Sequence, residues 1–251
     1  MELYKTFKKK KNKTIFVLSF SFLIIIILSL YLFFQNHFSK DVSYSLLLVL
    51  LVIYLVFIMY YRSILLEVMM KFHYYEMIND NLGLLEPHTT LYTKNWLNFL
   101  EQEFLKYYEN DKLIFYYKFY RKLPKLGRTG QAFFSVVVSK KENHNFYDDE
   151  VNKLIEEAFD NYKDQKRVKK QIMIQFKKYK KYNENSLEEL REIINFKNGD
   201  FVYINLPVGY FVNEDKVYFL RPKKRYSHKY YYFTCKMAKH LSYVDDGDKD
   251  E

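Results

Sequence analysis

The residues with the clearest chemical character in this sequence are two groups of cations. In residues 166–181, eight of sixteen side chains are basic and none is acidic, namely Lys166, Arg167, Lys169, Lys170, Lys177, Lys178, Lys180 and Lys181. The second group is interleaved with tyrosines and consists of Lys223, Lys224, Arg225 and Lys229. Each cation near an anionic bilayer contributes about 1 kcal/mol of binding. Cations beside aromatic rings also suit a nucleic-acid backbone and its bases. The sequence therefore predicts a basic surface formed by these residues.

Composition offers a simpler explanation for the same cations. The chain contains 33 lysines but only 7 arginines, together with 26 tyrosines and 23 phenylalanines. An AT-rich genome produces this bias without selection for binding. The last seven residues, 245–251, carry five acids against one lysine, so this acidic tail offsets part of the charge. Selection for binding and genome composition therefore both remain possible explanations of the basic groups.

One short string resembles a known phosphate-binding loop. The segment from Gly127 to Gly130, with Arg128 inside it, resembles the end of the loop found in cysteine-dependent protein phosphatases. That family places its nucleophilic cysteine six positions before the arginine, whereas this chain has Lys122 there. Because the thiolate is the group that attacks the substrate, phosphatase activity is not expected. A connection between two strands is the preferred interpretation.

Other chemical groups in the sequence do not form a recognisable active site. Cys235 is the only cysteine, and the six histidines are dispersed, with His228 and His240 the nearest to it. The paired carboxylates at Asp148 and Asp149 fall where a helix is expected to begin. We therefore expect no catalytic, cofactor-binding or metal-binding residues and favour a protein that is not an enzyme. Enzymatic activity stays open, because residues distant in sequence can converge in the fold.

Two uncharged segments near the N-terminus have the length of membrane spans. Residues 14–34 and 42–61 contain 21 and 20 residues without Asp, Glu, Lys, Arg or His. As helices they measure about 30 Å, which matches the hydrocarbon core of a bilayer. A cleaved signal peptide is the alternative for the first segment, but its apolar run is longer than usual for one. The sequence predicts a transmembrane hairpin at 14–61.

The lysines around these segments predict the orientation of the hairpin. Six lysines precede the first span within residues 1–13, and Arg62 and Lys71 follow the second, while the connecting turn carries only Lys40. Because positive charge favours the cytoplasmic side, both termini are expected there. The predicted location is the cell membrane, with two spans.

Hydrophobic periodicity predicts an α+β domain after the hairpin. The second membrane helix is expected to continue to about residue 80, within a helical linker at 62–110 that holds another helix at 94–108. Strands are expected at 112–121, 131–140, 168–176, 201–206, 210–212 and 216–221, and helices at 149–162 and 186–194. The segment 230–237 fits either a strand or a helix. Because the strands cluster instead of alternating with helices, a mostly antiparallel sheet with flanking helices is predicted for residues 111–244.

Together these features predict a membrane-anchored, non-enzymatic interaction protein. Its basic, aromatic-rich cytoplasmic domain is expected to meet the lipid bilayer, through anionic lipid headgroups, or a protein partner. The alternative is a membrane-tethered protein that binds or processes nucleic acid.

Overall fold

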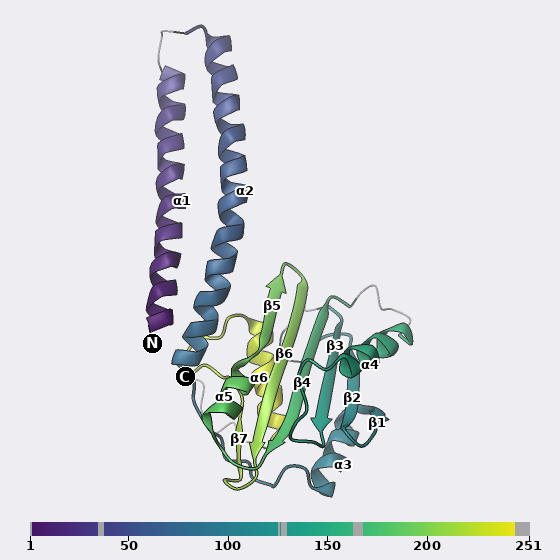
Figure 1. Cartoon of the computed structure of the whole chain (residues 1–251). Helices are drawn as coiled ribbons and strands as arrows, with labels where there is room; N and C mark the ends of the chain where they lie inside the picture. Colours follow the sequence, from purple (N-terminus) through teal and green to yellow (C-terminus); the bar gives the residue numbers. More distant parts are fainter. Residues whose placement is uncertain (1, 35–37, 125, 127–129, 163–167, 244–251) are drawn as a thin grey trace. The chain divides into compact units, whose positions relative to one another are not determined.

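The computed structural model describes residues 2–34, 38–124, 126, 130–162 and 168–243 (Figure 1). The chain forms two compact units, Met1–Asn79 and Asp80–Glu251. The first contains two long helices, and the second contains a sheet with helices on both faces. The acidic tail predicted at 245–251 lies outside the described residues.

The first unit is an antiparallel pair of helices, α1 at Glu2–Phe34 and α2 at Lys40–Asn79. Both are long and apolar enough to cross a membrane, and neither apolar window is buried inside the protein. Each helix runs on without interruption past the uncharged segment predicted from the sequence. At 33 and 40 residues, they measure about 50 and 60 Å, which exceeds a bilayer core.

Aromatic contacts join the polar ends of the two long helices. Tyr4 stacks on Phe72 with ring centroids 5.6 Å apart, and Phe7 stacks on Tyr75 at 5.2 Å. The Lys11 ammonium lies 3.7 Å from the Phe72 ring centroid. Such ring and cation–π contacts stabilise the pairing of the two helices at these ends. The hairpin is thus held together along a stalk, formed by residues 2–13 of α1 and 62–79 of α2, beyond its uncharged segments.

The second unit is built on a mixed sheet of seven strands. Its order is β1-β2-β3-β4-β6-β5, and β7 also pairs with β6. The strands are β1 Leu105–Glu109, β2 Leu113–Tyr120, β3 Ala132–Ser139, β4 Lys170–Tyr179, β5 Ile194–Asn198, β6 Phe201–Phe211 and β7 Lys216–Tyr218. The central strands β3, β4 and β6 are parallel, whereas every other pair is antiparallel.

The prediction of a mostly antiparallel sheet is therefore wrong, although the α+β prediction holds. Parallel neighbours need long crossover connections. Helix α4, Asp149–Asp160, connects β3 to β4, and helix α5, Glu184–Arg191, precedes β5 on the way from β4 to β6. The strand pattern identified the segments, but the two helices between them determine that the central strands run in the same direction.

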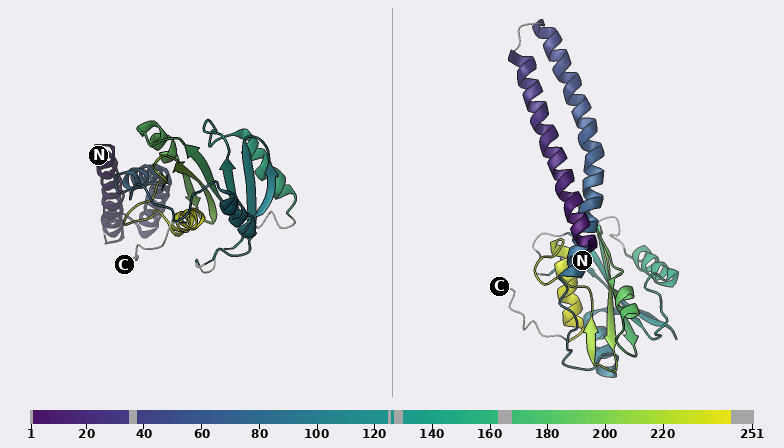
Figure 2. Two further views of the ribbon diagram at one scale, coloured as in Figure 1. Left: turned by 90° about the horizontal axis from the view of Figure 1, so that it is seen from below. Right: turned by 60° about the vertical axis from the view of Figure 1, so that its left-hand side comes forward.

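Helices cover both faces of the sheet (Figure 2). Helices α4 and α5 lie on one face, while α3, Lys94–Glu103, and α6, Lys229–Leu241, lie on the other. The apolar side of α4 packs against β2, β3 and β4. Val151 and Leu154 of the helix share a buried cluster with Phe133 of β3. On the opposite face, Trp96 of α3 contacts Phe176 of β4 edge to face, with centroids 5.2 Å apart. The central strands are therefore buried on both sides.

Several predicted element boundaries differ from the structure. Helix α3 ends at Glu103, because the next residues form the edge strand β1. Helix α5 begins at Glu184, two residues before the predicted start, and is capped by Asn183, whose side chain accepts from the Ser186 backbone N–H. The helix predicted over 186–194 stops at Arg191, and β5 follows from Ile194. The ambiguous segment at 230–237 lies inside helix α6.

Strand β6 continues through Pro207 and Gly209, where a break was predicted. On the side of β6 away from β4, β5 pairs only up to Asn205 and β7 begins at Gly209. Pro207 lies between these two partners, at a position without a neighbouring strand on that side. A proline, which lacks an N–H donor, is tolerated where the ladder is interrupted. Strand β6 is therefore continuous, and the interruption lies between its two neighbours, β5 and β7.

Gly209 provides a test of the packing between α5 and the sheet. A Cβ at this position would overlap Leu190 Cδ1 and would lie 3.2 Å from Tyr179 Cε2. Both neighbours are buried, so Gly209→Ala is expected to lower the free energy of unfolding by about 1–3 kcal/mol through overpacking. Denaturant unfolding of the full chain in detergent measures this loss.

Shortening the clashing side chain supplies the control. Leu190→Ala removes the overlapping atom and leaves a cavity that the new methyl group of Gly209→Ala partly fills. The double variant should therefore lose less free energy than the sum of the two single variants. Additive losses would show that Leu190 is not the side chain that excludes a Cβ at this position.

Candidate functional site

Buried polar side chains gather beneath the loop that connects β3 to α4. The side-chain amide of Gln175 on β4 donates to the Phe146 carbonyl at 2.6 Å and to Asn205 Oδ1 at 2.9 Å. Asn205 on β6 also donates to the Phe146 carbonyl, at 3.3 Å. Both side chains are almost fully buried. A loop carbonyl is thus satisfied from two parallel strands.

Lys177, two residues after Gln175 on β4, binds the same loop. Its ammonium donates to the His144 carbonyl at 2.8 Å and to Glu189 Oε1 of α5 at 2.6 Å. The other oxygen of Glu189 accepts from the Tyr179 hydroxyl at 2.6 Å. Burial, followed by this carboxylate, raises the pKa of Tyr179. The Lys177 side chain is 5% exposed, and its ammonium donates to both the loop and α5, so it fastens them to the sheet.

His144 is the titratable group of this loop. Burial lowers its pKa, and the nearby Lys177 charge acts in the same direction, while Asp148, Gln175 and Glu150 oppose the shift. Its Nε2 has no hydrogen-bond partner in the described structure. A neutral, enclosed imidazole against Phe146 fits the role of packing the loop. The cluster formed by Gln175, Lys177, Asn205 and Glu189 is a loop anchor built on β4, β6 and α5.

The basic residues predicted on one surface are distributed over both faces and both ends of β4. Lys170 and Lys177 are buried, which corrects their assignment to an exposed surface, and Lys178 lies against the Tyr92 ring at 4.9 Å. Lys180 and Lys181 are exposed after the strand ends. A strand of ten residues spans about 33 Å, so the two ends are separate places. Lys166 and Arg167 lie outside the described residues, as do Gly127, Arg128 and Thr129.

The second basic group lies between β7 and α6. Lys223, Lys224 and Arg225 are exposed, and the backbone amides of the first two donate to Asp80, the residue that follows α2 in the chain. The tyrosines of this segment are partly in the core. Tyr230 and Tyr231 are buried, and the Tyr231 hydroxyl donates to the Leu220 carbonyl at 2.7 Å. Those two rings are not available to stack on bases.

One lysine from each of the two basic groups lies close to the other in the fold. Lys170, at the start of β4, and Lys229, at the start of α6, place their ammonium groups 5.9 and 5.4 Å from the centroid of the Tyr230 ring. Lys169 precedes Lys170 in the chain, and its Nζ is 3.7 Å from Asp200 Oδ2. We call Lys169, Lys170 and Lys229 the lysine edge, because they lie where β4 and β6 begin.

An aromatic hollow adjoins the lysine edge. It has a volume of about 300 Å³ and is lined by Lys169 and Lys170 together with Phe159, Val168, Gln171, Phe196, Phe201, Val202 and Tyr203. Phe196 and Phe201 are 43% and 60% exposed, unusual values for phenylalanine in this domain. Lys169 lies 5.7 Å from the Phe201 ring centroid. Sequence reasoning missed these two rings, because exposure depends on where the sheet ends.

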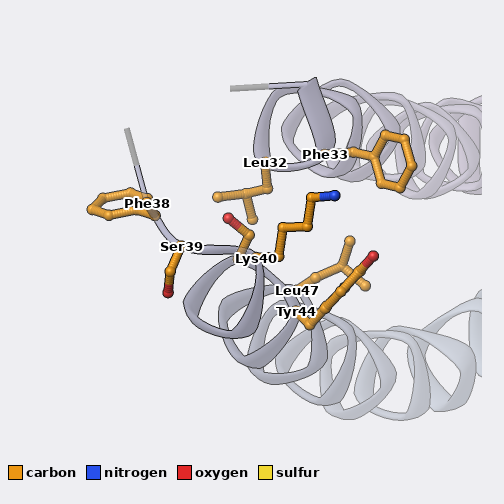
Figure 3. A pocket seen from close by; sticks show the side chains of 8 residues that line it. Leu32, Phe33, Phe38, Ser39, Lys40, Tyr44 and Leu47 are labelled. Carbon is orange, nitrogen blue, oxygen red and sulfur yellow. The ribbon is translucent and has the colours of Figure 1, made fainter. Parts of the chain in front are cut away.

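Another hollow, of about 470 Å³, lies at the turn of the hairpin (Figure 3). It is lined by the last turn of α1 and the first turns of α2. The Lys40 side chain extends from α2 toward Leu32 and Phe33 of α1. A cation near the C-terminal end of a helix is favoured by the helix dipole. Lys40 thus lines this hollow as an exposed residue at the start of α2.

The remaining chemical groups form no metal or thiol site among the described residues. No group of three potential ligands occurs there. Cys235 is buried in α6, where burial raises the pKa of its thiol, and its Sγ lies 3.9 Å from the Leu220 carbonyl oxygen. His240 is about half exposed on the same helix. Searches against protein-family models, curated proteins and solved structures found no match.

Glu189 provides a test of the loop anchor. Glu189→Gln removes the carboxylate that balances the buried Lys177 charge, so the free energy of unfolding should fall by about 2–4 kcal/mol. Glu188→Gln, on the exposed side of the same helix, is the matched control and should change little. Denaturant unfolding of the full chain in detergent measures both.

A second variant separates lost charge balance from general damage. Lys177→Met in the Glu189→Gln background removes the unbalanced charge and should recover part of the stability. If Glu189→Gln instead behaves like Glu188→Gln, the pair does not hold the loop as described.

Proposed function

We propose that this protein is a membrane-anchored binding protein whose cytoplasmic domain attaches to anionic lipid headgroups. The observation that carries the proposal is the lysine edge beside exposed Phe196 and Phe201. Cations attract an anionic leaflet, and exposed aromatic rings favour the boundary between headgroups and acyl chains. Few other described phenylalanines of the domain are so exposed, so this edge differs from the rest of its surface.

The proposed topology has two spans with both termini in the cytoplasm. The two long apolar helices support the spans, and the lysine count supports the orientation. In the proposed arrangement, the stalk beyond the spans carries Lys5, Lys8, Lys9, Lys10, Lys11, Lys13, Arg62 and Lys71 against Glu2, Glu67 and Glu76, a net charge of 8 − 3 = +5. The stalk would therefore add to the attraction of the protein for an anionic leaflet.

Binding is preferred to catalysis because the densest buried polar cluster has a structural task. Gln175, Lys177 and Asn205 donate to the carbonyls of the β3–α4 loop, and Glu189 balances the lysine. Nucleic-acid binding is the second candidate, favoured by Lys169 beside the exposed Phe201 ring. Lipid is preferred because Tyr230 and Tyr231, two tyrosines beside the second basic group, lie in the core and cannot stack on bases.

Cysteine labelling tests the proposed topology. A membrane-impermeant maleimide applied to intact cells should label Ser39→Cys at the turn and should not label Lys224→Cys in the domain. Both positions are exposed, whereas the native Cys235 is buried with a raised pKa and should stay unlabelled. Permeabilised cells, in which both variants should react, provide the control. Labelling of Lys224→Cys in intact cells would overturn the orientation.

Vesicle capture tests the binding surface. Full-length protein in neutral phosphatidylcholine nanodiscs should bind vesicles that contain phosphatidylglycerol. Reversal of two charges, Lys169→Glu with Lys229→Glu, should weaken this binding by about tenfold or more, since each cation contributes about 1 kcal/mol.

The matched control changes the same net charge at the other end of β4. Lys180→Glu with Lys181→Glu should have a much smaller effect. Equal losses in the two double variants would mean that only net charge matters and that the lysine edge is not the site. Retention of single-stranded RNA, lost in the lysine-edge variant, together with no binding of vesicles, would favour the second candidate function.

A further inference from the structure

The lysines at the start of α1 lie on two sides of the helix. On one side, Tyr4, Phe7 and Lys11 contact aromatic rings of α2. Away from these contacts, a hollow on the surface of α1 is lined by residues at helical spacing, which places them on one helix face. They are Lys5, Lys8, Lys9, Asn12, Lys13 and Phe16, and all six are exposed. The helix thus pairs with α2 through some of its lysines and leaves others at its surface.

Two phenylalanine rings continue this face into the uncharged segment. Phe16 stacks on Phe20 with ring centroids 5.9 Å apart, and the two residues are 67% and 54% exposed. Steps of four, three and four residues lead from Lys9 through Lys13 and Phe16 to Phe20, which keeps them on one side of an α-helix. We call these four residues the α1 stripe. It is cationic at one end and aromatic at the other, in the order of the headgroup and acyl chain of a phospholipid.

The two lysines of the α1 stripe have no carboxylate partner among the described residues. On α2, Lys71 donates to Glu67 at 2.6 Å. Glu2 is the only acid of α1 and precedes Lys9 by seven residues. Neither Lys9 nor Lys13 forms an ion pair with any residue that the structure describes. An anion that neutralises them therefore comes from outside the hairpin.

The position of the α1 stripe along the helix matches the depth of a phospholipid. Lys13 and Lys9 precede Thr14, where the uncharged segment begins, by one and five residues, or about 2 and 8 Å along the helix axis. The headgroup layer on each side of a bilayer is about 5–8 Å thick, so both side chains would reach a lipid phosphate. Phe16 and Phe20 lie about 3 and 9 Å on the other side of Thr14, at the level of acyl chains.

We propose that the α1 stripe binds one anionic phospholipid of the membrane that α1 spans. Lys9 and Lys13 hold the phosphate, and an acyl chain lies along Phe16 and Phe20. A phosphate monoester, with a charge of about −1.5 to −2, matches two lysines better than a phosphodiester with a single charge. The ligand is therefore a lipid of the phosphatidic acid type. The proposal rests on the proposed function, because α1 must span the membrane, and it assigns a lipid site separate from the lysine edge.

Native mass spectrometry of the full-length protein in detergent micelles tests this site. The protein is titrated with phosphatidic acid, and the spectra count the lipid molecules that remain bound. We expect one phosphatidic acid to bind in preference to phosphatidylcholine, whose headgroup has no net charge. Lys9→Gln with Lys13→Gln should weaken the binding of phosphatidic acid by at least about tenfold, because both charges that meet the phosphate are removed. Unchanged binding would overturn the proposal.

A second double variant removes the same charge away from the α1 stripe. Lys10→Gln is combined with Arg62→Gln, since Lys10 lies over the Phe7 ring and Arg62 belongs to α2. This variant should change the affinity by less than about threefold, because exposed charges away from the phosphate are screened by salt. Equal losses in the two double variants would show that only net charge matters and would overturn the site.

A soluble competitor tests the apolar half of the α1 stripe. Glycerol 3-phosphate carries the same phosphate group without acyl chains, so it should not displace phosphatidic acid. Displacement at equal concentration would show that Phe16 and Phe20 take no part in binding, and it would overturn the assignment to a membrane lipid.

The lipid site and the proposed function fail in different ways. If vesicles containing phosphatidylglycerol bind through the lysine edge but phosphatidic acid binds independently of Lys9 and Lys13, the proposed function stands and the site on α1 is overturned. If the binding of phosphatidic acid depends on Lys9 and Lys13 but no anionic vesicle binds, the site on α1 stands and attachment through the lysine edge is overturned.

Discussion

The fold of the domain depends on burying β4 on both faces between two parallel neighbours. A parallel ladder leaves no room for tight turns, so α4 and α5 must carry the chain back across one face, while α3 and α6 cover the other. Every polar side chain on β4 then needs a partner inside the protein or a ligand. Gln175 and Lys177 find theirs in the loop that follows β3.

The local features of this fold were accessible from the sequence. The absence of charge over 21 and 20 residues was sufficient to indicate two long apolar helices, and the apolar stripe of Val151, Leu154 and Ile155 identified α4. The relative direction of neighbouring strands could not be predicted, because alternating apolar residues occur in parallel and in antiparallel strands alike. Pro207 also led to a wrong prediction. Strand β6 accommodates this proline because a gap separates β5 from β7 on that side.

For the candidate site too, the sequence indicated which residues are basic but not which of them lie together in the fold. Eight cations in sixteen residues look like one surface in the sequence, but the two-residue repeat of a strand places Lys177 and Lys178 on opposite faces. Lys170 and Lys229 are 59 residues apart in the sequence, and both lie beside the Tyr230 ring because α6 begins near the start of β4. The pairing of Glu189 with Lys177 was equally hidden, because the two residues belong to different elements, α5 and β4.

The contact between α3 and α6 has a consequence for how the protein is made. The indole N–H of Trp96, the only tryptophan in the chain, donates at 2.7 Å to the carbonyl of Leu241, 145 residues later. The first helix of the domain therefore cannot complete its packing until the segment 229–241 has left the ribosome. During synthesis the two apolar helices emerge long before that point, so they can form before the domain folds. The indole would then report, through its fluorescence, the moment at which the last helix closes the core.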